Sequence, residues 1–375
     1  MQYRSFGRTG VQVSALGFGC MRLPMKGNRV DRRAALPMLQ RAYELGVNYF
    51  DTGKLYCEQD SERTLGEAVR GMDRSKVYLA TKYSQDAPTA RDLRAKFETS
   101  LKIMKLDYID FYHFWGISWE QFTTRLAIKG GPLEAFLKLK EEGLARRLSF
   151  SFHSAAEEMN RLVDTGYFET VLCQYNLLDR ANEKAIAYAA GKGLGVAIMG
   201  PVGGGRLVEP VNLLRRLLPG KRRVTTPELA LRFVLSNPGV SVALSGMSST
   251  EQVEENVATA SRTTQLTADE RERLARALDE TRTLADLYCT GCKYCMPCPN
   301  DVDIPRIFEL VNYRRVYGLV DYARQAYREL LEGRSWPKGA RAADACTQCG
   351  QCVEKCPQKI KIIEQLREAH RVLQE

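Results

Sequence analysis

Short hydrophobic runs rich in β-branched and aromatic residues alternate with longer amphipathic stretches along most of the chain. The runs have the length and composition of buried strands, and the stretches between them place apolar residues three and four positions apart, as one face of a helix requires. Eight candidate strands follow in chain order: LGFGCM, VNYFDT, KVYLATK, DYIDFYHFW, RRLSFSF, TVLCQYN, GLGVAIMG and VSVALSG. This alternation predicts an α/β fold with a parallel sheet.

Eight strand–helix units within roughly 280 residues favour a closed (β/α)8 TIM barrel. A doubly wound open sheet is the rival fold, but in a dinucleotide-binding sheet the first strand leads into a G-x-G-x-x-G turn. None of the candidate strands is followed by that turn, and the GPVGGG string after GLGVAIM matches it only weakly. We therefore expect the barrel, with its active site at the carboxyl ends of the strands.

The distribution of cysteine divides the chain of 375 residues into two parts. Three cysteines lie before residue 280, and eight lie between Cys289 and Cys356. The length is also more than one compact domain usually holds. We predict a barrel over residues 1–283 and a second, smaller domain over residues 284–375.

The cysteines of the second part form two runs with the spacing of iron–sulfur ligands. The run CTQCGQCVEKCP has the C-x2-C-x2-C-x3-C-P spacing of bacterial ferredoxins, and in CTGCKYCMPCP the last gap is one residue shorter. Two-residue gaps let three thiolates reach three corners of one [4Fe-4S] cluster, while the fourth cysteine points elsewhere. Two clusters are therefore expected. The predicted ligands are Cys289, Cys292, Cys295, Cys298, Cys346, Cys349, Cys352 and Cys356.

Two pairings of the fourth cysteines are open. In two-cluster ferredoxins the fourth cysteine of each run serves the other cluster, so we expect Cys298 to join the later trio and Cys356 the earlier one. In the alternative, each run closes on itself. A zinc or disulfide module also uses paired C-x-x-C units, but disulfides do not suit a reducing compartment, and eight thiols fill two clusters with none left over. The segment between the runs has helical periodicity, which predicts a mainly α-helical, ferredoxin-like domain.

Composition and charge narrow the partners. Hydrophobic residues make up 44% of the chain, which suits a folded protein with a sizeable core. The start lacks the basic and apolar segments of a signal peptide, and no apolar run is long enough to cross a bilayer, so we expect a cytoplasmic protein without a membrane partner. The net charge of +10 is scattered and no nucleic-acid motif is present. Nucleic acid is therefore not expected, and a ferredoxin-type electron carrier is the macromolecular partner that suits this charge.

Three strings of the first part resemble the aldo/keto reductases. They are FDTGKLYCEQDSERTLGEAV, VYLATK and SGMSSTEQVEEN, and together with CMPCP and CGQCVEKCP they resemble the branch with a C-terminal 4Fe-4S domain. The resemblance implies that Tyr56 donates a proton to a substrate carbonyl oxygen, that Lys82 is the neighbouring cation, and that Asp51 is the carboxylate partner of that cation. The chemistry agrees, because a phenol with an ordinary pKa of about 10 becomes a better acid beside a positive charge.

The resemblance also implies a nicotinamide nucleotide, NADPH or NADH. The residues at the nucleotide-contacting positions of the family are Ser149, Ser151, Gln174, Asn176, Ser248, Glu255 and Asn256. Typical relatives hold the 2′-phosphate of NADP with a lysine and an arginine, and Gly246 and Gln252 stand at those places here. Because phosphate recognition depends on such cations, the sequence does not predict which nucleotide is preferred, although Ser248 and Ser249 offer hydroxyl donors to a phosphate.

The catalytic histidine of the family has no direct counterpart. Aligned on the strand DYIDFYHFW, its position is occupied by Trp115, and His113 lies two residues earlier. Alternation along a strand puts both side chains on one face, with His113 roughly 6.6 Å deeper. His113 is thus a candidate catalytic residue or, equally, a buried hydrogen-bonded one. His153, just after RRLSFSF, is a candidate substrate or cofactor contact, and the flat ring of Trp115 favours a planar substrate.

Two enzymatic functions fit these residues. The first is NAD(P)H-dependent reduction of a small-molecule carbonyl or conjugated enone, with structural or regulatory clusters. The second is a ferredoxin-linked reductase whose electrons enter through the clusters, with little or no nicotinamide use; it accounts for the mismatch between one-electron clusters and a two-electron hydride donor. We favour the first because Asp51, Tyr56 and Lys82 keep the hydride-transfer pattern. The same pattern argues against a barrel that serves only as the docking body of an electron carrier.

Overall fold

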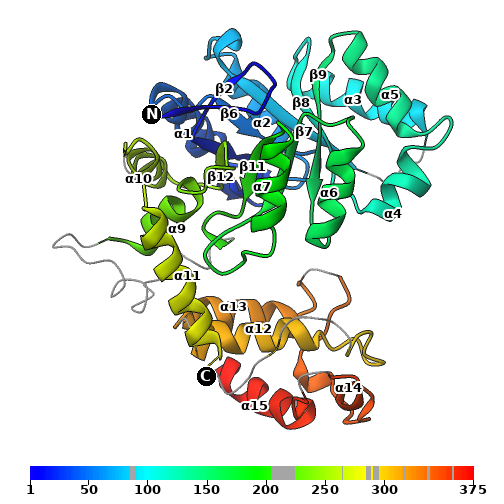
Figure 1. The fold of residues 1–375 in the computed structure, drawn as a ribbon, viewed down its shortest axis with the longest axis vertical. Coiled ribbons are helices and arrows are strands. Elements are labelled where there is room, and N and C mark those ends of the chain that lie inside the picture. The colour runs from blue at the N-terminus through cyan, green and yellow to red at the C-terminus, as the bar shows by residue number, and fades with distance from the viewer. Residues whose placement is uncertain are drawn as a thin grey trace. The chain divides into compact units, whose positions relative to one another are not determined.

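A computed structural model of the chain describes residues 1–84, 89–203, 224–263, 265–283, 289, 295–315, 318–335, 338–356 and 359–375. These residues belong to two compact units: the first covers the described residues up to 203 and from 227 to 268, and the second covers residues 224–226 and those from 269 onward (Figure 1). Helix α11 (Ala268–Thr283) ends where we predict the domain boundary from the sequence. That boundary stays a prediction.

Eight parallel strands close into a barrel in the first unit, which confirms the predicted (β/α)8 fold. The strands are β3 (Leu16–Gly19), β6 (Tyr49–Asp51), β7 (Tyr78–Tyr83), β8 (Ile109–Phe114), β9 (Ala145–Phe152), β10 (Thr170–Gln174), β11 (Gly195–Met199) and β12 (Val242–Ser245). Each pairs with the next along the chain, and β12 closes the barrel on β3, with Ser245 opposite Phe18. Six of them lie within the predicted strings, and β7 and β9 each extend one residue beyond, to Tyr83 and from Ala145.

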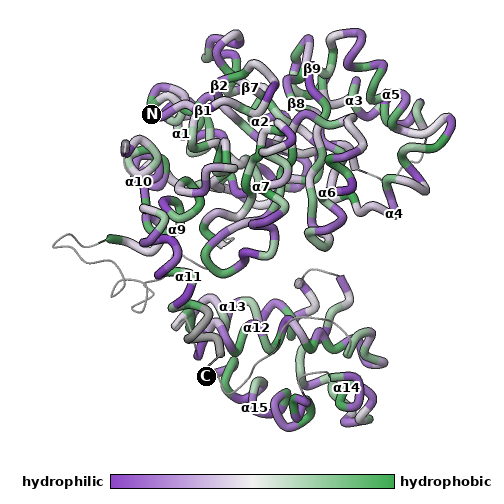
Figure 2. Tube along the Cα trace, in the orientation of Figure 1, coloured by the Kyte–Doolittle hydropathy of each residue, from purple (hydrophilic) through white to green (hydrophobic). Residues whose placement is uncertain are grey.

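Amphipathic helices surround the barrel (Figure 1). They are α1 (Arg32–Glu44), α2 (Ser61–Val69), α3 (Ala90–Met104), α5 (Pro132–Glu141), α6 (Ala156–Asp164), α7 (Glu183–Gly191), α9 (Thr226–Leu235) and α10 (Thr250–Ala260). Figure 2 shows hydrophobic and hydrophilic positions mixed along them. Helix α3, for example, buries Leu93, Phe97 and Met104, whose spacing puts them on one face. Thr89 begins this helix by accepting the backbone N–H of Asp92 at 3.2 Å.

An amino-terminal hairpin fills the barrel at the end where the strands begin. It consists of β1 (Tyr3–Ser5) and β2 (Gln12–Ser14). The ring centroid of Phe6 lies 5.4 Å from that of Tyr49 and 5.0 Å from that of Phe111. The turn at Gly7 has φ +59°, and a Cβ there would stand 2.2 Å from the backbone nitrogen of Gly195, so only glycine fits. The apolar interior therefore occupies this end and leaves the carboxyl ends of the strands for polar side chains.

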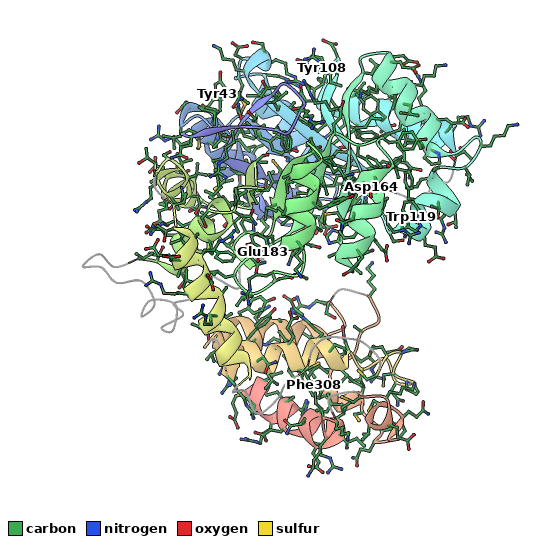
Figure 3. The ribbon with its side chains drawn as sticks, viewed as in Figure 1. Tyr43, Tyr108, Trp119, Asp164, Glu183 and Phe308 are labelled. Atoms are coloured by element: carbon green, nitrogen blue, oxygen red, sulfur yellow. The ribbon has the colours of Figure 1, made fainter. Side chains whose placement is uncertain are left out.

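The second unit is mainly helical, as predicted. Its elements after α11 are α12 (Ile304–Arg315), α13 (Val320–Leu331), η5 (Ala343–Ala345), α14 (Gln351–Glu354) and α15 (Ile362–Gln374). Helices α12, α13 and α15 pack on one another, and Phe308 of α12 lies buried among them (Figure 3). A parallel bridge joins Val302, which follows the first cysteine run, to Arg341, which precedes the second. Within the described ranges, none of the helices combines the length and hydropathy that crossing a bilayer requires.

Candidate functional site

A buried ion pair lies at the carboxyl ends of β6 and β7. Asp51 is the last residue of β6, and Lys82 lies one residue before the end of β7. The Nζ of Lys82 donates to Oδ1 of Asp51 at 2.5 Å and to the carbonyl oxygen of Thr52 at 2.6 Å. Both charged residues are only 3% exposed. The structure therefore brings together the cation and the carboxylate that the sequence pairs.

Burial and pairing act in opposite directions on this pair. Burial raises the pKa of Asp51, and the charge and hydrogen bond of Lys82 oppose that rise. Burial alone would lower the pKa of Lys82, but Asp51 and Tyr56 more than offset it, and the net pKa is raised. Lys82 is therefore an ammonium at neutral pH, with Asp51 as its counter-charge.

The phenol of Tyr56 contacts Lys82. Their side chains are hydrogen-bonded, and the Nζ of Lys82 lies 4.8 Å from the centroid of the tyrosine ring. Burial raises the pKa of Tyr56, Lys82 lowers it and Asp51 raises it again, so that the net pKa is above its ordinary value. The lysine thus acts in the expected direction, but desolvation of the phenolate outweighs it. Tyr56 stays a protonated phenol, which is the form that a proton donor needs.

The backbone after Tyr56 is held in an uncommon conformation. Positions 57–59 have φ angles of 51°, 52° and 66°, in the left-handed region that costs a residue with a side chain roughly 1–2 kcal/mol. The turn ends at Asp60, whose carboxylate binds Arg32 through both oxygens and accepts the N–H of Val30 at 3.0 Å. No local sequence pattern predicts this anchor, because its partners are distant along the chain and positions 57–59 contain no glycine.

His113 adjoins the ion pair from β8. Its position is opposite Lys82 in the strand register, and its side chain is fully buried. The Nε2 of His113 lies 3.7 Å from Oδ2 of Asp51, and within the described part of the chain neither atom has a hydrogen-bond partner. Burial and the charge of Lys82 lower the pKa of His113 well below its ordinary value. The Phe150 backbone raises this pKa, but by less. The structure therefore places His113 beside Asp51 as a neutral group.

Two further side chains border Tyr56 and Lys82. Trp115, directly after β8, meets the ring of Tyr56 edge to face, with centroids 5.4 Å apart and planes at 84°. His153, directly after β9, is exposed, and partial desolvation and the charge of Lys82 lower its pKa. A Cβ on Gly116 would lie 3.5 Å from Cδ2 of His153, so the histidine stands next to the turn that follows Trp115. Both residues thus lie around the phenol and the ammonium.

The hydroxyl groups predicted to face a nicotinamide have partners within the protein. Ser149 is fully buried and exchanges hydrogen bonds of 2.9 and 2.7 Å with Thr170 on the neighbouring strand. The Oγ of Ser151 accepts the N–H of Gly116 at 2.8 Å. Ser149 is therefore part of the barrel interior, and Ser151 fixes the turn beside Trp115.

The two amides predicted to contact the nicotinamide lie at the end of β10. Asn176 donates to the carbonyl oxygen of Gly200 at 3.0 Å and accepts the N–H of Leu178 at 2.9 Å. Gln174 also adjoins Gly200, because a Cβ at that position would stand 3.1 Å from Oε1 of Gln174. Both amides therefore lie beside the backbone of Gly200, directly after β11.

The predicted contacts for the other half of the nucleotide lie where β12 leads into α10. Gln252 turns its Oε1 back onto Ser248, accepting the backbone N–H at 2.9 Å. Asn256 donates to Oγ of Ser245 at 3.2 Å, and Glu255 is exposed. The structure thus gathers Ser248, Asn256 and Glu255 around the start of one helix.

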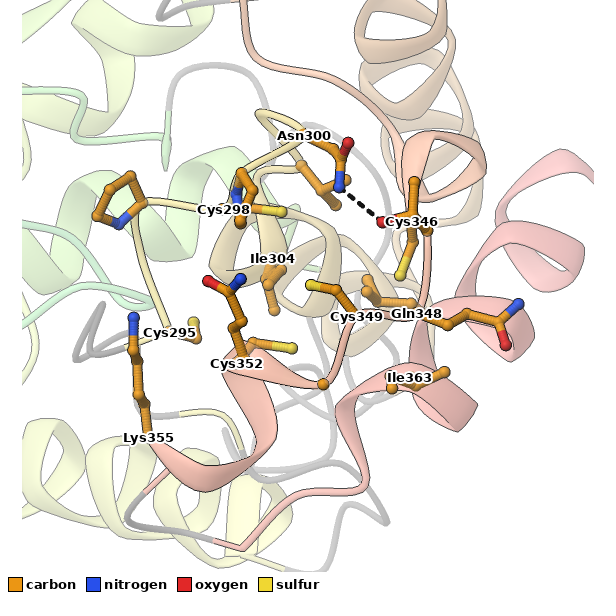
Figure 4. A pocket seen from close by; sticks show the side chains of 17 residues that line it. Cys295, Cys298, Asn300, Ile304, Cys346, Gln348, Cys349, Cys352, Lys355 and Ile363 are labelled. Atoms are coloured by element: carbon orange, nitrogen blue, oxygen red, sulfur yellow. Dashed lines mark hydrogen bonds between the residues drawn. The ribbon is translucent and has the colours of Figure 1, made fainter.

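Five of the predicted cluster ligands line one pocket in the second unit (Figure 4). They are Cys295, Cys298, Cys346, Cys349 and Cys352. Burial raises the pKa of Cys352, and a hydrogen bond from its own backbone lowers it. Three nearby thiols raise this pKa further, and they are Cys346, Cys349 and Cys298. Cys352 and these three neighbours are the later trio together with Cys298, the fourth cysteine of the earlier run.

The chemistry of this pocket suits an iron–sulfur cluster. Five cysteine thiols line one space whose walls include the apolar side chains of Ile304, Ile363 and Leu366. Cys289 and Cys356 are half-buried and do not line this pocket, and Cys292 lies outside the described residues. Across the described part of both units, no three His, Cys, Asp or Glu side chains are grouped closely enough to hold a single metal ion.

Two family profiles match the sequence. One, described as "Aldo/keto reductase family", covers residues 15–279, and the other, described as "4Fe-4S dicluster domain", covers residues 288–361. They succeed each other along the chain in the order that the sequence analysis predicts.

Individual relatives extend the comparison. L-galactose dehydrogenase of Arabidopsis thaliana is 30% identical over 285 residues, which are 69% of this chain and 88% of that protein. The NADH-specific methylglyoxal reductase of Escherichia coli is 24% identical over 67% of this chain and 91% of its own length. Among solved structures, the holo form of an aldo-keto reductase from Bacillus halodurans has a TM-score of 0.63 at 30% identity, covering 74% of this chain and 96% of that one.

Proposed function

The chain belongs to the aldo/keto reductase family of oxidoreductases and carries a 4Fe-4S dicluster domain, and on this premise we propose that it reduces a carbonyl or conjugated enone at Asp51, Tyr56 and Lys82. The reductant in this proposal is NADPH or NADH, since the family uses a nicotinamide cofactor. The substrate is a small molecule that reaches the carboxyl ends of the barrel strands.

The buried pair of Lys82 and Asp51, in contact with the phenol of Tyr56, carries this proposal. Placing two charges out of water is unfavourable unless they are well paired, so a barrel gains little stability from such a pair. The pair stands where TIM barrels perform chemistry, and it touches a group that can lose a proton. A catalytic role explains both its cost and its place.

Tyr56 is the proton donor in this mechanism. Reduction of a carbonyl adds a hydride to carbon and a proton to oxygen, and the bound nicotinamide supplies the hydride. Tyr56 gives its phenol proton to the oxygen as negative charge develops there, and Lys82 stabilises the phenolate that remains. Asp51 keeps Lys82 charged and directed at the phenol. A proton from solvent then restores Tyr56.

Trp115 and His153 shape the space for the substrate. The indole beside Tyr56 offers a flat apolar face, so an aromatic or conjugated carbonyl fits better than a short aliphatic one. His153 is exposed and its pKa is lowered, first by partial desolvation and then by Lys82, so it is neutral at pH 7. A neutral imidazole here donates a second hydrogen bond to the carbonyl oxygen, in a role that buried His113 does not reach.

The nucleotide lies along the ends of β10 and β12 in this proposal. The amides of Gln174 and Asn176, beside Gly200, hold the carboxamide. The start of α10, with Ser248, accepts the phosphorylated half. One relative is named for its use of NADH, so membership of the family leaves the choice of nucleotide to residues of this chain.

The second unit holds two [4Fe-4S] clusters in this proposal. Cys298 completes one of them with the trio Cys346, Cys349 and Cys352, which its place at the same pocket supports. Cys356 completes the other with the earlier trio. Because a cluster transfers one electron and a nicotinamide two, the clusters have a structural or regulatory role, or exchange electrons with a ferredoxin-type carrier.

A ferredoxin-linked reductase is the second candidate function. It is favoured by Trp115, which stands where the family places its catalytic histidine, and by the electron count of the clusters. In this alternative, electrons pass through the clusters and the barrel binds a substrate without nicotinamide.

Replacing Tyr56 by Phe separates the two candidates. The change removes only the phenol hydroxyl, and we expect kcat/KM with NAD(P)H and an aromatic carbonyl to fall by about 10²–10⁴-fold, with nucleotide affinity unchanged. Tyr108→Phe is the matched control, because that ring is packed 4.1 Å from the guanidinium carbon of Arg74 and 3.4 Å from that of Arg146, at the opposite end of β8. Full activity in Tyr56→Phe would refute the proposed mechanism.

A further inference from the structure

The turn that joins Tyr56 to helix α2 has a strained backbone. Positions 57–59 follow one another in the left-handed region, with φ angles of 51°, 52° and 66°. Residues with a side chain rarely adopt this region even singly. Two backbone hydrogen bonds span the turn, from the N–H of Asp60 to the carbonyl oxygen of Cys57 at 3.0 Å and from that of Ser61 to Tyr56 at 3.3 Å. Three strained positions in succession call for a stronger contact to hold them.

Asp60 makes that contact with a distant segment. It stands at the N-cap of α2, where an aspartate usually accepts a backbone N–H of its own helix, but in the described helix its side chain makes no such bond. Its Oδ1 accepts from Nη2 of Arg32 at 2.8 Å, and its Oδ2 accepts from Nη1 of the same guanidinium and from the N–H of Val30. The side chain of Asp60 is only 10% exposed, so water screens this ion pair little.

Arg32 is itself fixed in place as the first residue of α1. Its Nε donates to a carboxylate oxygen of Glu67 at 3.1 Å, and its Nη1 donates to the carbonyl oxygen of Val30 at 3.2 Å. The hydrogen bond from Arg32 lowers the pKa of Asp60 below its ordinary value, although burial opposes it, so the pair stays charged at neutral pH. The guanidinium thus ties the start of α1 to two carboxylates, one before α2 and one within it.

We propose that Arg32 and Asp60 are positioning residues, whose ion pair holds the strained turn and thereby keeps the phenol of Tyr56 against Lys82. This inference rests on the proton donation proposed above. Tyr56 directly precedes the turn, and its carbonyl oxygen accepts the N–H of the residue after Asp60. Without the ion pair, positions 57–59 can leave the left-handed region, and Tyr56 moves with them. A displacement of about 1 Å at a reacting group can lower a rate about 10²-fold.

The effect on turnover distinguishes positioning from general stability. We expect Arg32→Met to lower kcat with NAD(P)H and an aromatic carbonyl about 10- to 100-fold, while KM for the nucleotide changes less than about threefold. Arg32→Lys should fall between Arg32→Met and the wild type, because an ammonium keeps the charge but lacks the parallel N–H groups.

Arg74→Met is the matched control for these variants. Arg74 is exposed to a similar degree, 23% against 26% for Arg32, and its Nη2 lies 2.7 Å from a carboxylate oxygen of buried Asp110. Asp110 is the second residue of β8, so this ion pair lies at the end of the barrel where the strands begin. Arg74→Met should therefore lose stability to thermal unfolding and keep its kcat.

Glycine in the turn tests the strain itself. Glu58 and Gln59 are exposed, and glycine populates the left-handed region about as readily as the right-handed one. Glu58→Gly/Gln59→Gly should leave kcat of the wild type within about threefold and should raise that of Arg32→Met about three- to tenfold. Alanine at the same two positions should restore nothing, because its Cβ keeps the strain. Thermal unfolding of each variant verifies the fold.

A measurement that needs no turnover reports on the ring of Tyr56 directly. Fluorine NMR of the holoprotein with fluorotyrosine in place of tyrosine reflects the surroundings of each ring, and the signal of Tyr56 is identified by its absence in Tyr56→Phe. We expect this signal to shift or broaden in Arg32→Met and to keep its place in Arg74→Met.

The outcomes separate this inference from the proposed function. A normal kcat in Arg32→Met, or equal losses in Arg32→Met and Arg74→Met, would overturn the inference and leave the reductase intact. A loss that glycine does not restore would mean that Arg32 acts other than through the strained turn, which also overturns it. If the wild type reduces no carbonyl with either nucleotide, the proposed function fails, and the fluorine signal still decides whether Arg32 holds the ring of Tyr56 in place.

Discussion

Replacing Lys82 by Met should make the stability of the barrel depend on pH in a way that the wild type does not. In the wild type, Lys82 is the partner of Oδ1 of Asp51 at 2.5 Å, while Oδ2 has no hydrogen-bond partner among the described residues. Methionine keeps the apolar stem and removes the charge. Burial already raises the pKa of Asp51, and without the ammonium nothing comparable opposes that rise.

The size of the effect follows from the proton that the folded state must bind. An aspartate in the unfolded chain has a pKa of about 3.9. If its carboxyl stays protonated in the folded state, each pH unit above that value lowers the free energy of unfolding by about 1.4 kcal/mol. The folded pKa is the higher one, so stability is complete below about pH 4 and is lost as the pH rises. At pH 7 the loss is about 4 kcal/mol, in line with the roughly 3–5 kcal/mol for breaking a buried ion pair.

Urea denaturation between pH 5.5 and 7.5 measures this dependence in the anaerobic holoprotein, with the fluorescence of Trp115 and Trp119 reporting on the barrel. In this variant the proton can also reside on His113, whose pKa is no longer lowered by Lys82. The slope of stability against pH reports the number of bound protons, so it is the same whether Asp51 or His113 holds the proton. In the control Lys82→Met/Asp51→Asn the pH dependence of stability should again run parallel to that of the wild type. A Lys82→Met protein whose stability runs parallel to that of the wild type would refute the reasoning.

The remaining predictions concern the neighbours of Tyr56 and the clusters. Trp115→Ala should raise KM about two- to tenfold for an aromatic carbonyl and little for an aliphatic one, since an edge-to-face aromatic contact contributes roughly 0.5–1.5 kcal/mol; equal changes for the two substrates in steady-state kinetics would contradict a stacking role. His113→Gln should leave the pH profile of kcat unchanged between pH 5.5 and 8, because the pKa of His113 is held well below its ordinary value; the loss of an ionisation from that profile would show that it titrates in turnover. Cys298→Ser should remove the cluster of the later trio and Cys356→Ser the other one; iron analysis and electron paramagnetic resonance would expose a wrong pairing if each variant lost the cluster of its own run.

The barrel is predictable because its strands are buried on both faces. In β8, IDFYHF, every residue is buried, and four of the six are hydrophobic or aromatic, with only Asp110 and His113 between them. The cysteine runs are predictable for a related reason, since the spacing that lets three thiols converge is local. Asp51, Tyr56 and Lys82 lie in strings that resemble one family, and the structure brings them into contact.

The rest of the site depends on contacts that no local pattern encodes. The alternation of side chains along β8 puts His113 below Trp115. Only the stagger of the strands in the closed barrel places Asp51 beside His113, with Oδ2 of Asp51 3.7 Å from Nε2 of His113. The net rise in the pKa of Tyr56 comes from burial, which depends on the whole surroundings of the ring.

The central claim is that this barrel performs nicotinamide-dependent chemistry, and an anaerobic titration with NADPH and NADH tests it most directly. Nucleotide fluorescence and the visible absorbance of the clusters are followed in the same sample. The account predicts that at least one of the two nucleotides binds tightly and that the clusters stay oxidised, because the hydride goes to a substrate at Tyr56. If neither nucleotide binds, the barrel does not use nicotinamide, and electrons for its substrate must enter through the clusters.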